Sequence, residues 1–90
     1  MPKFDTASVF DFVHVVLLLA IQYRFSVTSW LRSPARNVAV GGHLHSYHML
    51  GLGLDVILDP GEDKNAFFED AKRLGLSALD EGDHIHLQPL

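Results

Sequence analysis

The chain has 90 residues, which is enough for one small domain, so we expect residues 1–90 to fold as a single unit. Its hydrophobic fraction of 48% is sufficient for a buried core, and its net charge of -4 comes without any basic run. Nucleic-acid binding normally needs clustered Lys and Arg, so the sequence argues against that class of partner. The absence of cysteine excludes disulfides and thiolate metal sites.

The first predicted element is a helix over about residues 6–23, with Thr6 or Ser8 as its N-cap. Apolar residues recur at helical spacing on one side of this helix and also occur on its opposite side, which predicts that the helix is covered on more than one side. The apolar run at 13–21 is shorter than the about 20 residues that span a bilayer and lacks the flanks of a signal peptide. We therefore expect neither a membrane span nor an export signal. The stripe at helical spacing that we expect to be buried is Val9, Phe12, Val13, Val16, Leu17 and Ala20.

Two strands are expected between the helices of this chain. Apolar and hydroxylated residues alternate over 25–30, which is the pattern of a half-buried strand. Residues 54–58 predict a second strand, and the sequence Asp-Pro-Gly-Glu at 59–62 predicts the turn that closes it.

The C-terminal third is expected to contain a helix and a hairpin. Residues 64–74 predict the helix, with Asp63 as its N-cap and Gly75 as its stop. Residues 76–79 and 84–88 predict two strands joined by a turn. This order of elements predicts an α+β fold, in which an antiparallel sheet is flanked by two or more helices.

Histidine and acidic residues gather in two windows that are distant in the sequence. His48 precedes Asp55 by seven residues, across a glycine-containing stretch that can bend sharply. Near the C-terminus, His84 and His86 would share one face of a strand while their neighbours pack into the core. Imidazole and carboxylate bind Zn²⁺ readily, and three protein ligands leave one position open for water. We therefore expect a catalytic zinc site on the sheet.

These motifs resemble those of the M15 zinc peptidases, which include D-Ala-D-Ala carboxypeptidases and related peptidoglycan-cutting enzymes. The first family motif, Ser-x-His-x-x-Gly-x-Ala-x-Asp, is matched from Ser46 to Asp55, with Gly53 at the alanine position. Residues 28–34 and 40–42 are similar to the family's lead-in, and 83–88 fits its last motif. The resemblance covers about residues 25–88 and implies a small zinc fold of the Hedgehog-like type.

The resemblance implies roles for the matched residues. Asp83 would be the general base that moves a proton from the attacking water to the leaving amine. Arg32 would pair with a substrate carboxylate, and Ser46 would help to hold the peptide. The zinc ligands would be His48, Asp55 and His86.

The last motif also permits a second register, in which Glu81 is the base and His84 is the third ligand. We prefer His86 as the ligand, because Leu87 and Gln88 after it align better with the family pattern. His84 would then lie beside the metal, where it could stabilise the oxyanion.

The leading functional hypothesis is a zinc peptidase that cleaves peptidoglycan stem peptides, as a carboxypeptidase or an endopeptidase. We expect action at the bacterial cell wall, by a phage endolysin-like enzyme released on lysis or carried on a virion. The alternatives are a catalytically inactive zinc-containing binding module and an assembly domain in which the metal only stabilises the fold. The presence of Asp83 and Arg32 favours the enzyme, and the oligomeric state stays open.

Overall fold

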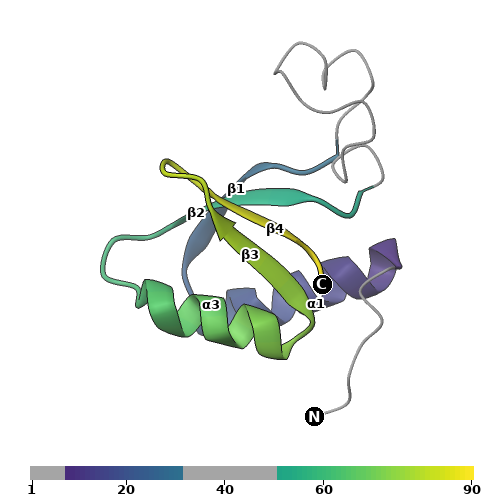
Figure 1. Cartoon of the computed structure of the whole chain (residues 1–90), viewed down its shortest axis with the longest axis horizontal. Coiled ribbons are helices and arrows are strands. Elements are labelled where there is room, and N and C mark those ends of the chain that lie inside the picture. The colour runs from purple at the N-terminus through teal and green to yellow at the C-terminus, as the bar shows by residue number, and fades with distance from the viewer. Residues whose placement is uncertain (1–7, 32–50) are drawn as a thin grey trace.

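The computed structural model describes residues 8–31 and 51–90, and every structural statement below concerns these residues. The four strands form one antiparallel sheet in the order β1-β2-β4-β3, and both helices lie on the same side of it (Figure 1). This arrangement confirms the predicted α+β fold. The elements are α1 (Val9–Gln22), β1 (Phe25–Ser29), β2 (Leu54–Leu58), α3 (Lys64–Arg73), β3 (Leu76–Asp80) and β4 (Ile85–Pro89).

The core lies between the two helices and one face of the sheet. Successive side chains of a strand point to opposite faces, so alternate residues of β2 and β4 enter the core and the residues between them face away. Ile85 and Leu87 are buried, as predicted from the His-x-His pattern. The buried apolar residues are Phe12, Val15, Val16, Leu19, Leu54, Val56, Phe67, Ala71, Leu76, Ile85 and Leu87.

Helix α1 differs from its prediction in the side that it buries. Only one side meets the sheet and α3, whereas Phe10, Leu17 and Ile21 are exposed to solvent. The expectation of cover on more than one side was therefore wrong for the described residues, and the buried stripe is Phe12, Val15, Val16 and Leu19. Periodicity could not choose between the sides because both are apolar. No helix within 8–31 or 51–90 is long and apolar enough to span a bilayer.

The N-terminus of α3 is capped by a side-chain hydrogen bond, and that of α1 is not. Ser8 occupies the N-cap position of α1 without a capping side-chain bond, and Thr6 lies outside the described residues. In α3, Asp63 Oδ1 accepts a hydrogen bond of 3.1 Å from the backbone N–H of Ala66, as expected of an N-cap. The helix ends before Gly75, whose φ of 92° lies in the left-handed region that favours glycine. The predicted start and stop of α3 are confirmed.

Tyr23 joins the end of α1 to the middle of α3. Its hydroxyl donates a hydrogen bond of 2.5 Å to Asp70 Oδ2. Its ring packs edge-on against Phe67, with the ring centroids 5.3 Å apart. The hydrogen bond to the Asp70 carboxylate, together with burial and the charge of Asp70, raises the pKa of Tyr23 to about 12. This contact therefore links the two helices that cover the sheet.

Replacing Tyr23 by Phe should lower the free energy of unfolding by about 1.5–3 kcal/mol, because the charge-assisted hydrogen bond is lost while the ring packing remains. Above pH 10.0 the unfolded chain ionises Tyr23 first, so the wild type should lose stability up to about pH 12. Tyr23→Phe should lack that part of the alkaline loss. Urea denaturation at several pH values measures both effects.

Arg73→Ala is the matched control, because it removes an exposed ion pair of 2.9 Å to the same Asp70. An exposed pair of this kind contributes about 0–1 kcal/mol. Equal destabilisation by the two variants would contradict a special role for Tyr23.

Candidate active site

The pairing of β2 with β4 brings two predicted ligands together. Asp55 is the direct partner of His86 in the sheet, and both lie on the face opposite the helices. The Nδ1 atom of His86 lies 3.0 Å from Asp55 Oδ1, and the two side chains are only 14% and 13% exposed. Two donors on a tetrahedral Zn²⁺ with bonds of about 2.0–2.1 Å lie roughly 3.3 Å apart. A shared metal would therefore need only a small adjustment, so this pair fits zinc.

Gln88 makes a contact that the sequence did not predict. Its Oε1 atom lies 2.8 Å from His86 Nε2, so each ring nitrogen of His86 faces an oxygen of a different side chain. Residues 86 and 88 are two apart on β4 and therefore share a face. The spacing could have indicated this contact, but many pairs in strands have the same spacing without any bond.

His84 lies immediately before β4, at the end of the hairpin from β3. Its Nδ1 is 2.6 Å from Asp83 Oδ1. Its Nε2 approaches Asp55 Oδ1 and Glu81 Oε2, at 3.8 Å in each case. His84 thus lies between the Asp55–His86 pair and both candidates for the general base.

The hairpin holds these groups by short local bonds. Gly82 has a φ of 93°, and its N–H donates to Asp80 Oδ1 over 3.0 Å. The backbone N–H of Glu81 donates to the carbonyl oxygen of His84 over 2.9 Å. The turn therefore fixes where His84 leaves the hairpin and enters the sheet.

The charges in the hairpin alter two ionisation equilibria. The hydrogen bond to Asp83 raises the pKa of His84, and the charges of Asp55, Asp83 and Glu81 add to that effect. The same bond, with the charge of His84, lowers the pKa of Asp83, whose side chain is 91% exposed. Near neutral pH this arrangement favours an ionised Asp83 and a His84 that is more readily protonated than an isolated imidazole.

Three of the predicted site residues lie outside the described residues: Arg32, Ser46 and His48. Among the residues that the structure does describe, no group of three or more His, Asp or Glu side chains forms a metal site. The three-ligand set of His48, Asp55 and His86 therefore stays a prediction, of which the structure shows the Asp55–His86 pair.

Two side-chain hydrogen bonds join the end of β1 to residues 51–55. The indole N–H of Trp30, just after β1, donates to the carbonyl oxygen of Gly51 over 2.9 Å. The hydroxyl of Thr28 donates to the carbonyl oxygen of Asp55 over 3.3 Å. These bonds join the end of β1 to the start of β2, at the end of the sheet where Asp55 lies.

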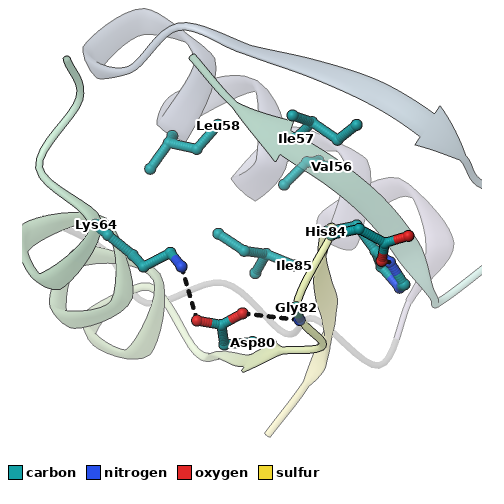
Figure 2. Close-up of a pocket in the computed structure, with 9 residues that line it drawn as sticks. Val56, Ile57, Leu58, Lys64, Asp80, Gly82, His84 and Ile85 are labelled. Carbon is teal, nitrogen blue, oxygen red and sulfur yellow. Dashed lines mark hydrogen bonds and ion pairs between the residues drawn. The ribbon is translucent and has the colours of Figure 1, made fainter. Parts of the chain in front are cut away.

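A small pocket opens beside the hairpin, with a volume of about 110 Å³. Figure 2 shows Lys64 and Asp80 on one side of it and His84 on the other, with Ile85 between them. Lys64 Nζ and Asp80 Oδ2 form an ion pair of 2.7 Å across its rim. Pockets for drug-sized ligands have volumes of about 300–1,000 Å³, so this one has room for a single small side chain.

Replacing Asp83 by Asn should lower the pKa of His84, because the amide removes the charge that stabilises the imidazolium. An NMR titration of the ring protons of His84, with a chelator present, measures the shift. Glu81→Gln is the control and should have a smaller effect, since Glu81 is the weakest of the three acidic contributors. A His84 titration that is unchanged in Asp83→Asn would contradict the observed pair.

The sequence profile of the Peptidase M15 family matches residues 9–88, which is most of the chain and includes every described residue of the site. Neither the curated proteins nor the solved structures contain a match to this chain. Members of the matched family are generally zinc-dependent, which agrees with the chemistry of the Asp55–His86 pair. The chain belongs to the M15 family of peptidases.

Proposed function

We propose that this protein is a zinc-dependent peptidase that cleaves peptidoglycan stem peptides, as a carboxypeptidase or an endopeptidase. The observation that carries the proposal is the Asp55–His86 pair, with 3.0 Å between Oδ1 and Nδ1, in a chain of a peptidase family. By this hypothesis the enzyme acts at the bacterial cell wall, in the manner of a phage endolysin.

Asp55, His86 and His48 would hold the metal. When bound, Zn²⁺ acts as a Lewis acid that polarises the scissile carbonyl and makes water nucleophilic near neutral pH. The Trp30–Gly51 hydrogen bond supports His48 as the third ligand. Gly51 comes three positions after His48 in the sequence, and three positions of an extended chain span at most about 11 Å, at about 3.6 Å per residue.

Asp83 and His84 would handle the proton and the developing charge. The lowered pKa of Asp83 keeps its carboxylate ionised and able to accept a proton from the attacking water, which it then passes to the leaving amine. The raised pKa of His84 favours a protonated ring, which can donate a hydrogen bond to the carbonyl oxygen as negative charge develops there.

The distances around Asp55 support His86 over His84 as the third ligand. His86 Nδ1 is 3.0 Å from Asp55 Oδ1, whereas His84 Nε2 is 3.8 Å away and the other ring nitrogen of His84 is engaged by Asp83. In the second register Glu81 would be the base. The contact of 3.8 Å between Glu81 and His84 is longer than a hydrogen bond, so it supports that register less well.

Recognition of the peptide would involve Arg32 and Ser46, on the strength of the family motif. The fork of donors on Arg32 suits a terminal carboxylate. The pocket beside His84 would accept one small side chain next to the scissile bond.

One observation favours the alternative, a catalytically inactive zinc-containing binding or assembly module. Pairing with His84 makes Asp83 a weaker base in the free protein than an isolated carboxylate. Metal binding without hydrolysis would support that alternative.

The purified protein should bind one Zn²⁺ per chain, measured by metal analysis and by competition with a chromogenic chelator. His86→Ala should lose most of the zinc affinity, because it removes a ligand, whereas His84→Ala should retain it. The opposite ranking would assign the third ligand to His84. Absence of zinc binding by the wild type under any condition would rule out the proposed site.

Asp83→Ala should reduce hydrolysis of peptidoglycan by about 10²–10⁴-fold, since a general base contributes about that factor, while zinc stays bound. Mass analysis of the released peptides gives the rate and the scissile bond together. Glu81→Ala is the matched control on the same hairpin and should keep most of the activity. If Glu81→Ala is inactive and Asp83→Ala is not, Glu81 is the base.

A further inference from the structure

We propose that Gln88 is a positioning residue for His86: its amide oxygen fixes the ring so that Nδ1 faces Asp55 and the metal. The proposal rests on the proposed function, in which Asp55 and His86 bind zinc. Gln88 is the final residue of the last family motif, which gives it no role, and the proposal supplies one.

The geometry of β4 makes the contact possible. His86 and Gln88 are on the same face of the strand, and Gln88 Oε1 lies 2.8 Å from His86 Nε2. An amide oxygen can only accept a hydrogen bond, so Nε2 must carry the proton of this contact. The other ring nitrogen, Nδ1, faces Asp55 Oδ1 over 3.0 Å, and zinc bound between these two atoms would take the place of their direct contact.

Partial burial gives this hydrogen bond its influence. The His86 side chain is 14% exposed, so few water molecules can replace a lost partner at Nε2. Without an acceptor, the buried N–H would be unsatisfied, and rotation of the ring would become less costly. Such outer contacts fix the tautomer and orientation of a ligating imidazole, and their loss typically costs about 10–100-fold in metal affinity.

The two histidines of the site are oriented by partners of different chemistry. His84 is held by the negatively charged Asp83 carboxylate, with 2.6 Å between Nδ1 and Oδ1. His86 is held at Nε2 by the neutral amide of Gln88, which accepts a hydrogen bond without adding negative charge. This difference agrees with a division of labour, in which His84 donates to substrate and His86 binds the metal.

Zinc affinity of three variants tests the proposal, by competition with a chromogenic chelator at about pH 8, where free imidazole is neutral. Gln88→Met, which has a similar length and no acceptor, should bind zinc roughly 10–100-fold more weakly than the wild type. Gln88→Glu keeps an acceptor and should bind at least as tightly. Gln22→Met makes the same change at an exposed position at the end of α1 and should bind as the wild type does.

An NMR measurement distinguishes positioning from a general loss of structure. The Nε2–H proton of His86 should exchange slowly in the wild type and in Gln88→Glu, with or without zinc, and should exchange fast in Gln88→Met. Equal zinc affinity of the wild type and Gln88→Met would overturn the proposal and leave the proposed function intact. Equal weakening in Gln88→Met and Gln88→Glu would overturn it too, because retention of the acceptor would then have no effect. Failure of the wild type to bind zinc would overturn both.

Discussion

The antiparallel register between β2 and β4 determines the core and the candidate site at the same time. It sets Asp55 opposite His86 on the face of the sheet that points away from the helices, and it turns four apolar residues of the same strands toward the helices. A slip of one residue in either strand would turn its apolar residues to solvent and its site residue toward the core. Each fully buried apolar side chain contributes about 1.5–3 kcal/mol, and a small domain is stable by only about 5–15 kcal/mol. The hydrophobic core therefore holds the two polar side chains in place, although neither of them belongs to it.

The hairpin between β3 and β4 decides the electrostatics around the Asp55–His86 pair. It places His84 between Asp55 on the sheet and the acidic residues of the turn, with Asp83 at hydrogen-bond distance. The result is an alternation of charge, in which a readily protonated imidazole lies beside a carboxylate that can hold a metal. A peptidase needs both an electron-poor group near the carbonyl oxygen and a carboxylate near the attacking water. The hydrogen bonds of Gly82 and Glu81 within the turn hold the backbone that carries these charged side chains.

The family match and the contacts around His86 are two separate reasons to regard this face of the sheet as the candidate active site. The family match concerns the chain as a whole, whereas the contacts around His86 are specific to a few side chains. Asp55 connects them, because it ends the first family motif and is the sheet partner of His86 in the last one. The strand pair that buries the core thus also brings Asp55 of the first motif beside His86 of the last one.

The sequence by itself determined the elements whose signals are local. The 54–58 strand was predicted with its observed bounds, and α3 was predicted with its Asp63 cap and its end before Gly75, since a cap or a turn depends on neighbours a few residues away. Alternation also predicted that Ile85 and Leu87 would be buried and that the histidines beside them would not. Only the tertiary structure decided which side of α1 is buried, because both sides are apolar and the choice depends on the surfaces of the sheet and α3. It also decided that Asp83 contacts His84 and that Gln88 contacts His86. Those contacts depend on strand register and side-chain rotamers, which are set by packing between segments that are distant in the chain.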